Sequence, residues 1–255
     1  FEGYWGRKPN VKSARFRAIP DTAARVSALR AGDVHLITNL PPDFVETIRK
    51  TPGMGVETVP SSRVLFIALV NTKKSPLQDV RVRRALSLAI DRDAIVAQVM
   101  EGVALPINQV VPPGVYGYAP ALAAPRADLP AARRLLAEAG YPRGFGITLH
   151  GSSDRYPNDA RIAQAVGQMW TRLGVRTDVA VTPFAIYLQR ATRPENSAFL
   201  ASWGSGSADP TSALRSVVAS FDPARGLGSV NRGRYSNPAF DAGLTTHAGY
   251  AQLQA

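Results

Sequence analysis

Residues 75–92 read SPLQDVRVRRALSLAIDR, and this stretch decides how the larger part of the 255-residue chain folds. Asp79 is a suitable N-cap, because its carboxylate can accept hydrogen bonds from the free amides of a first helical turn. After it, apolar residues recur at helical spacing, which is typical of a helix that packs one face on a core. The pattern predicts one long helix from about Val80 to Met100, ended by Gly102.

On either side of this helix, short apolar runs alternate with capped amphipathic stretches. Strands are expected where polarity alternates or a short apolar run occurs, and helices where apolar residues return every three or four positions. The predicted strands are residues 13–19, 34–37, 64–70, 146–149, 175–181 and 198–203, and the predicted helices are about 21–32, 42–51, 128–140, 158–173 and 184–191. Residues 103–127 are rich in Pro, Gly and Ala and predict a long loop. Helices that alternate with strands indicate a layered α/β fold.

Composition excludes several classes of protein. Hydrophobic residues make up 45% of the chain, enough for a packed core, and no apolar run reaches the roughly 20 residues that a membrane-spanning helix needs. Cysteine is absent, so disulfides and thiolate chemistry are excluded. The net charge of +11 is spread along the chain and forms no basic stripe or tail of the kind that nucleic-acid-binding proteins use. We interpret it as a basic surface that aids solubility, and nucleic acid is not an expected partner.

No local motif predicts catalysis or metal binding. The three histidines, His35, His150 and His247, are far apart in the sequence, and none stands in a metal-ligand spacing. The chain has no HExxH, no P-loop, no complete GxGxxG and no serine in a nucleophile elbow. The expected function is therefore not enzymatic, with no catalytic residue, no metal and no cofactor. A hydrolase or transferase whose site is assembled from distant residues stays open as the alternative.

Several phrases, in order along the chain, resemble one protein family. They are YWGRKP at 4–9, ALRAGDV at 28–34, the stretch 75–92, LLAEAGYP at 135–142 and RYSNP at 234–238. The ordered set resembles the extracytoplasmic solute-binding proteins of ABC transporters, in the peptide/nickel family of dipeptide- and oligopeptide-binding proteins. The phrases themselves carry caps, turns and core positions, so they indicate the fold and not the ligand.

This resemblance implies an α/β fold of the periplasmic-binding-protein type II, in which two lobes enclose a cleft. Residues 1–74 resemble part of lobe I and end at a hinge near Asn71 and Thr72, and residues 75–255 resemble lobe III, with a mixed sheet and flanking helices. Family members are considerably longer, so the chain is expected to be a fragment with a signal peptide upstream. The resemblance implies a monomeric periplasmic component of an ABC importer. It would capture a peptide, an opine or a similar solute and deliver it to a permease in the inner membrane.

Two loops resemble loops that contact the ligand in this family, at residues 152–158 and 203–210. In a dipeptide binder, an Arg and a Tyr of the first loop face the ligand. Tyr156 matches that Tyr, while the Arg position falls on Asp154, with Arg155 next to it. The ligand-binding residues that the two loops imply are Asp154, Arg155, Tyr156, Trp203, Gly204, Ser205, Gly206 and Asp209.

The second loop departs from the family pattern at Gly206, where the family has the Asp that holds a peptide ammonium. An ammonium left without a carboxylate partner in a buried site would cost several kcal/mol. Either Asp154 or Asp209 replaces that carboxylate, or the ligand is not an ordinary α-amino peptide.

Three of these residues also have purely structural interpretations. Asp209 fits as the N-cap of a following helix at 210–218, with Pro210 at its first position. Arg155 can be an ordinary surface residue. Trp203, at the end of a strand, can pack in the core or form a wall of a cleft.

Overall fold

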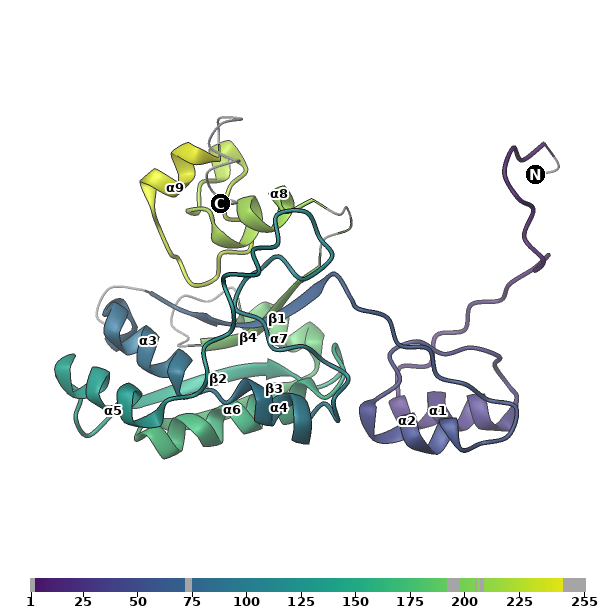
Figure 1. Ribbon diagram of the computed structural model, residues 1–255, viewed down its shortest axis with the longest axis horizontal. Coiled ribbons are helices and arrows are strands. Elements are labelled where there is room, and N and C mark those ends of the chain that lie inside the picture. Colours follow the sequence, from purple (N-terminus) through teal and green to yellow (C-terminus); the bar gives the residue numbers. More distant parts are fainter. Residues whose placement is uncertain (1–2, 72–74, 192–197, 205, 207–208, 245–255) are drawn as a thin grey trace.

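Figure 1 shows the computed structural model, which describes residues 3–71, 75–191, 198–204, 206 and 209–244. The strands are β1 (Arg63–Leu69), β2 (Gly146–Ser152), β3 (Arg176–Thr182) and β4 (Ala198–Gly204). The α-helices are α1 (Thr22–Ala31), α2 (Pro42–Arg49), α3 (Val80–Leu88), α4 (Arg92–Gln98), α5 (Leu129–Glu138), α6 (Asp159–Leu173), α7 (Phe184–Arg190), α8 (Thr211–Ala213) and α9 (Pro238–Gly243). Short turns of other helix types are η1 (Pro76–Gln78), η2 (Leu214–Val218) and η3 (Pro223–Arg225).

The four described strands form one mixed sheet in the order β1-β4-β2-β3 (Figure 1). Strand β2 runs parallel to both of its neighbours, β3 and β4, while the edge strand β1 runs antiparallel to β4. In the β1–β4 ladder, Arg63 lies opposite Gly204 and Leu69 lies opposite Ala198. The expected α/β fold with a mixed sheet and flanking helices is confirmed.

Helices cover both faces of the sheet. Apolar residues of α3, α5 and α6 form the main core with one face, and α7 packs with Phe199 on the other face. Trp170 of α6 is 1% exposed, and its indole nitrogen donates to the Leu86 carbonyl at 3.0 Å. Burial of a large aromatic side chain is favourable, and the hydrogen bond satisfies its polar atom. The hydrogen bond from Trp170 to Leu86 therefore links α6 to α3.

The N-terminal segment forms a small helical pair, α1 and α2, which lies beside the sheet-containing body in Figure 1. Its buried side chains include Val26, Val45 and Ile48. The strands predicted at 13–19 and 34–37 do not form, and this prediction was wrong. A strand is stable only when a partner takes its backbone hydrogen bonds, and no strand within the described residues pairs with either segment.

The long helix predicted from Val80 to Met100 is divided into α3 and α4. The break falls at Asp91, whose backbone is extended with ψ of 93°. Its carboxylate accepts from the Ala94 amide at 2.9 Å, so Asp91 starts a second helix instead of continuing the first. The apolar periodicity runs through both helices, which is why the sequence pattern alone does not reveal the break.

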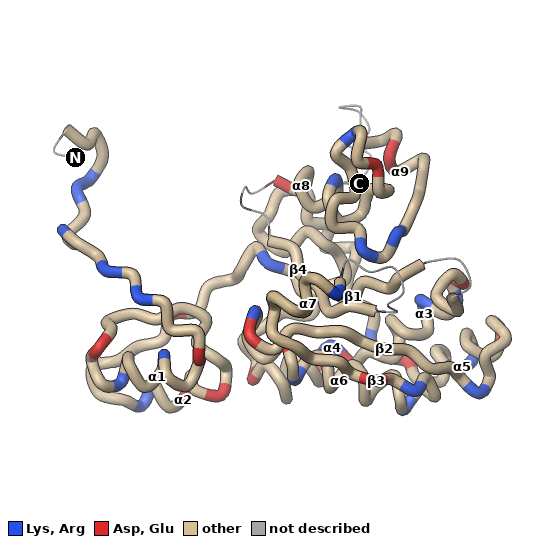
Figure 2. Tube along the Cα trace, turned by 180° about the vertical axis from the view of Figure 1, so that it is seen from behind, with Lys and Arg blue, Asp and Glu red and all other residues tan. Residues whose placement is uncertain are grey.

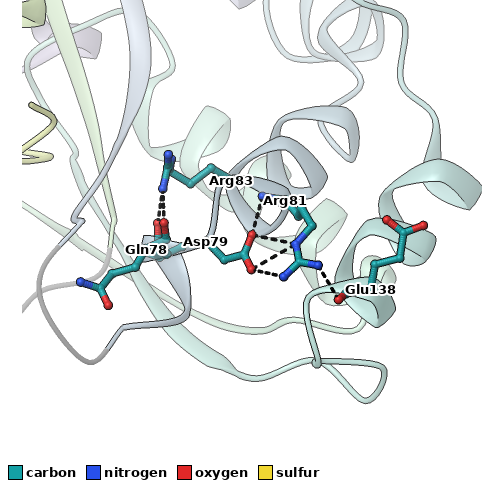
Figure 3. A network of polar contacts seen from close by, with 6 residues as sticks. Gln78, Asp79, Arg81, Arg83 and Glu138 are labelled. Atoms are coloured by element: carbon teal, nitrogen blue, oxygen red, sulfur yellow. Dashed lines mark hydrogen bonds and ion pairs between the residues drawn. The ribbon is translucent and has the colours of Figure 1, made fainter. Parts of the chain in front are cut away.

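The start of α3 is held by an ion pair at the boundary of the two sequence segments (Figure 3). Asp79 caps α3 by accepting from the Arg81 amide at 2.8 Å, and the Arg81 guanidinium lies 2.6 Å from the same carboxylate. Those hydrogen bonds with Arg81 lower the pKa of Asp79 to about 2. Arg81 also donates to the Glu138 carbonyl at 2.7 Å, and Arg83 donates to the carbonyls of the preceding turn. The capping residue predicted for this helix is confirmed, and its partner Arg81 ties α3 to α5.

Strand β1 precedes the boundary predicted at residue 74, yet it completes the sheet of the following segment through β4. The assignment of the two segments to two lobes stays a prediction.

Lys and Arg are distributed along the whole trace and are not gathered on one element (Figure 2). Among the described residues, no helix combines the length and the apolar character needed to cross a bilayer.

Candidate ligand-binding site

The two loops predicted to bind ligand follow β2 and β4, at one edge of the sheet. Strands β2, β3 and β4 are mutually parallel, so their carboxyl ends meet at this edge, and antiparallel β1 begins there with Arg63. In the sheet, β3 lies on one side of β2, and the next strand along the chain, β4, lies on the other side of β2. The strand order therefore reverses direction at β2. Open α/β sheets bind ligands outside the carboxyl ends of their strands at such a switch point.

The loop after β2 is organised from inside by Asp159, the first residue of α6. Its side chain is 1% exposed, and one carboxylate oxygen accepts from the Ser152 hydroxyl at 2.6 Å and from the Arg155 and Tyr156 amides at 3.1 Å each. The other oxygen accepts from the Ala160 amide at 2.9 Å. A buried carboxylate is tolerated because hydrogen bonds replace its hydration. Sequence reasoning placed a helix start here but missed this role. The sequence signal that could have revealed this role is that Asp159 is a second aspartate in the turn that also contains Asp154.

Arg155 and Tyr156 point their side chains to a common surface. The Arg155 guanidinium carbon lies 5.7 Å from the centroid of the Tyr156 ring and 5.1 Å from that of Phe184, at the start of α7. Both distances allow cation–π attraction, which is worth roughly 0.5–1 kcal/mol at exposed sites. Arg155 is exposed, as its surface interpretation required, but it is held against two rings.

Asp154 and Asp209, the two alternatives for the missing ammonium partner, each accept a hydrogen bond from an amide at the start of a helix. Asp154 accepts from the Phe184 amide at 2.7 Å, at the beginning of α7. Asp209 accepts from the Thr211 amide at 2.6 Å, as a capping residue does, although α8 starts at Thr211 and Pro210 occupies its N-cap position. The helix expected there differs from the prediction, because α8 passes after three residues into the π-helical turn η2.

The loop after β4 is described in part. Trp203 is half-buried at the end of the strand, and its indole nitrogen is buried without an acceptor among the described residues. Gly206 is exposed, and Ser205 lies outside the described residues. A buried N–H normally finds a partner, so the indole nitrogen of Trp203 is an exception among the described residues.

Arg63 joins the two loops, and sequence reasoning missed it. Its guanidinium donates to the Ser202 hydroxyl at 2.9 Å, and its central carbon lies 5.6 Å from the Tyr156 ring centroid. A Cβ atom added at Gly204 would lie 3.1 Å from the guanidinium, so glycine leaves room for it. The structure therefore brings Arg63, Arg155, Tyr156 and Gly204 to one edge.

Under this surface lies Tyr187 of α7, which is 4% exposed. Its hydroxyl donates to the Leu200 carbonyl at 2.8 Å. Burial raises the pKa of Tyr187 to about 12, because the phenolate would lose its hydration. The Tyr187 side chain is therefore uncharged at physiological pH, and it packs beneath the surface formed by the two loops.

Two concavities lie away from these residues. One of about 490 Å³ lies between α6 and β3, and one of about 260 Å³ lies beside β1, with Asn71 and Arg232 in its lining. None of the predicted site residues lines either of them. The described residues of the predicted set lie instead in the loops that follow β2 and β4.

A sequence model of one protein family covers most of the chain. The description of this family is bacterial extracellular solute-binding proteins, family 5, middle part, and the match runs over residues 1–224. The chain belongs to this family. The expected resemblance to solute-binding proteins is confirmed.

Individual proteins that are similar to this family 5 chain support the same family assignment. The dipeptide-binding protein of Escherichia coli (strain K12) is 29% identical over 82% of this chain and 40% of its own length. Heme-binding protein A of Haemophilus influenzae is 30% identical over 97% of this chain and 45% of its own length. The periplasmic binding protein DppA of Helicobacter pylori, solved with the peptide STSA, superposes with a TM-score of 0.81 at 27% identity, over 98% of this chain and 49% of that one. The family 5 chain thus spans about half the length of these relatives or less.

Proposed function

We propose that this chain forms one wall of the ligand site in the solute-binding component of an ABC importer. The observation that carries the proposal is the convergence of the two predicted loops, where Arg63 contacts both Tyr156 and the Gly204 turn. This convergence occurs at the strand-order switch, where sheets of this kind bind ligands. Relatives named as dipeptide-, heme- and glutathione-binding proteins support capture of a peptide or a similar solute.

In this proposal, residues 1–74 belong to lobe I and residues 75–255 to lobe III. The connection near Asn71 acts as a hinge that closes the lobes on the solute. The Asn71 amide donates to the Gly233 carbonyl at 2.7 Å, which ties the end of β1 to the C-terminal part of the chain. Thr72 lies outside the described residues.

The proposed protein is a monomeric, periplasmic binding component that performs no catalysis and hands its solute to a membrane permease. Arg155 and Tyr156 contact the solute from one loop, and Trp203 forms part of the wall from the other. The alternative, a hydrolase or transferase, gains support from no arrangement among the described residues.

A ligand screen on the full-length protein tests the proposal. We expect thermal stabilisation by at least one solute from a panel of dipeptides, tripeptides, glutathione, opines and metal chelates. Trp203→Ala should then weaken binding by roughly tenfold in calorimetry, because a buried aromatic contact is lost. The unfolding midpoint without ligand should change little. Tyr116→Ala, at a ring that is 71% exposed, is the matched control. Absence of stabilisation by any member of the panel would contradict the proposal.

A further inference from the structure

Two guanidinium groups flank one aromatic ring at the edge of the sheet. The central carbons of Arg63 and Arg155 lie 5.6 and 5.7 Å from the Tyr156 centroid, so the two carbons are at most about 11.3 Å apart. Arg63 comes from the start of β1, and Arg155 comes from the loop after β2. Two like charges within this distance repel each other weakly in water, and an anion that lies near both is attracted to both.

Within the described part of the chain, Arg63 and Arg155 form no ion pair, whereas Arg81 and Arg161 do. The ring contacts and the bond from Arg63 to the Ser202 hydroxyl leave most of the donors of both groups without a partner among the described residues.

The carboxylates of the surrounding loops already have other roles. Asp159 is buried and accepts four hydrogen bonds from the loop and the start of α6. Asp154 and Asp209 each accept from the first amides of a helix. Gly206 offers no side chain where an ammonium partner was expected. The described surface is therefore suited to negative charge and not to an ammonium.

The local backbone also favours this position of Arg63. A Cβ atom at Gly204 would lie 3.1 Å from one terminal nitrogen of the guanidinium and 3.2 Å from its central carbon. Contacts of this length are tighter than ordinary van der Waals packing. Glycine at the end of β4 thus leaves room for the guanidinium, which also donates to the Ser202 hydroxyl.

We propose that Arg63 and Arg155 together hold a doubly negative oxyanion group of the solute, either two neighbouring carboxylates or a phosphate. This inference rests on the proposed function. Guanidinium groups present planar forks of donors that match carboxylate and phosphate oxygens. In an acidic peptide, one guanidinium binds the terminal carboxylate and the other binds a second acidic group. A cationic solute is disfavoured at this surface, because the loop carboxylates Asp154 and Asp209 already accept hydrogen bonds from helix amides.

Matched pairs of peptides test the inference on the full-length protein. Ala-Glu against Ala-Gln changes a carboxylate into its isosteric amide, and Ala-phosphoserine against Ala-Ser adds a phosphate. In calorimetry we expect the acidic member of at least one pair to bind about tenfold or more tightly, the size expected for one hydrogen bond to a charged group. The two pairs distinguish a carboxylate from a phosphate.

Variants then assign the preference to Arg63. Arg63→Gln should abolish the acid preference, because it should weaken binding of the acidic member of each pair by more than binding of the neutral member. Gly204→Ala keeps all charges and should reduce the preference by displacing the guanidinium. It also serves as a second test if Arg63→Gln unfolds. Arg84→Gln, an exposed arginine of α3, is the matched control and should keep the preference.

Three results are decisive. Acid preference that depends on Arg63 supports the inference. Binding of neutral and acidic peptides with equal affinity, or a preference that survives Arg63→Gln, overturns the inference and leaves the proposed function standing. Failure of every peptide in these pairs and in the wider panel overturns both.

Discussion

Arg161 of α6 donates from a single guanidinium nitrogen to both carboxylate oxygens of Asp43 in α2, at 2.8 and 2.9 Å. Helix α2 belongs to the segment proposed as lobe I, and α6 belongs to the segment proposed as lobe III. The ion pair therefore joins the two proposed lobes. Both side chains are about half exposed, at 47% and 48%, so water and salt screen their attraction.

A double-mutant cycle with Asp43→Asn and Arg161→Gln should give a coupling free energy of about 0.2–1 kcal/mol, as exposed ion pairs do. The measurement is urea unfolding at low salt, repeated in 1 M NaCl, where the coupling should nearly vanish because the Debye length falls to about 3 Å. Arg172→Gln combined with Asp43→Asn is the control cycle, since Arg172 forms no ion pair in the described chain. A coupling that does not change with salt would contradict this account.

Replacing Asp159 should destabilise the protein and loosen the loop that carries Arg155 and Tyr156. Asp159→Ala leaves the buried Ser152 hydroxyl and two loop amides without their acceptor. An unsatisfied buried donor costs about 1–3 kcal/mol, so we expect a loss of about 3 kcal/mol or more in the free energy of unfolding. Asp159→Asn keeps one oxygen acceptor and should lose less.

Chemical denaturation measures that loss, and hydrogen exchange at the Arg155 and Tyr156 amides reports on the loop. Asp93→Ala removes an exposed acidic residue from the first turn of α4 and should cost less than 1 kcal/mol. Exchange protection that is unchanged in Asp159→Ala would show that the carboxylate does not position the loop.

Tyr187 should make stability fall at high pH. Its pKa is about 12 in the folded protein against 10.0 for a model tyrosine, so the fold favours the neutral phenol. A raised pKa of this kind contributes stability that is complete below pH 10 and is lost as pH rises from 10 to 12. Tyr187→Phe should lack this steep decline, although it loses the hydrogen bond to Leu200 at every pH.

Unfolding free energies measured from about pH 8, where both states of Tyr187 are neutral, up to about pH 12 test this expectation. The exposed Tyr116→Phe is the control and should follow the wild-type curve. If Tyr187→Phe and wild type decline in parallel above pH 10, the hydroxyl of Tyr187 is not the group responsible.

Asp79 should have the opposite effect in acid. Its pKa is lowered from 3.8 to about 2, chiefly by its hydrogen bonds with Arg81. A lowered pKa contributes stability that is present above pH 3.8 and is lost as pH falls towards 2. Asp79→Asn keeps a capping side chain but removes the charge, so its stability should depend less on pH in this window.

Asp128→Asn is the matched control for this acid titration, because Asp128 caps α5 by accepting from the Ala131 amide without an ion pair in the described chain. Circular dichroism during acid titration compares the three proteins. Identical acid midpoints for wild type and Asp79→Asn would contradict a role for the Asp79–Arg81 pair in acid stability.

The sequence was a reliable guide to helix starts. Asp79 was predicted as an N-cap, Asp21 and Asp128 stand at the predicted starts of two other helices, and each of the three accepts from an amide two or three residues ahead. A cap is decided within one turn of chain, so the local residues contain the necessary information. The break at Asp91 was missed because apolar periodicity continues across it, although Asp91 is itself a cap of the same kind.

The candidate site was predictable in part. Both loops were placed by their resemblance to family loops, and Asp209 was given its capping role. The role of Asp159 was missed because its hydrogen bonds depend on how the chain folds back after β2. Strand prediction at 13–19 was wrong because an alternating pattern indicates a half-buried strand only when a partner strand and a core exist.

By itself, the sequence determined the family, most of the helices and strands, and the residues that face the core. These features depend on side-chain polarity and on interactions over a few positions. Only the tertiary structure decided that Arg63 lies beside Ser202, 139 residues away, and beside the ring of Tyr156. That meeting is produced by the antiparallel pairing of β1 with β4 and the parallel pairing of β4 with β2. Its physical basis is backbone hydrogen bonding between distant strands, which local polarity patterns do not encode.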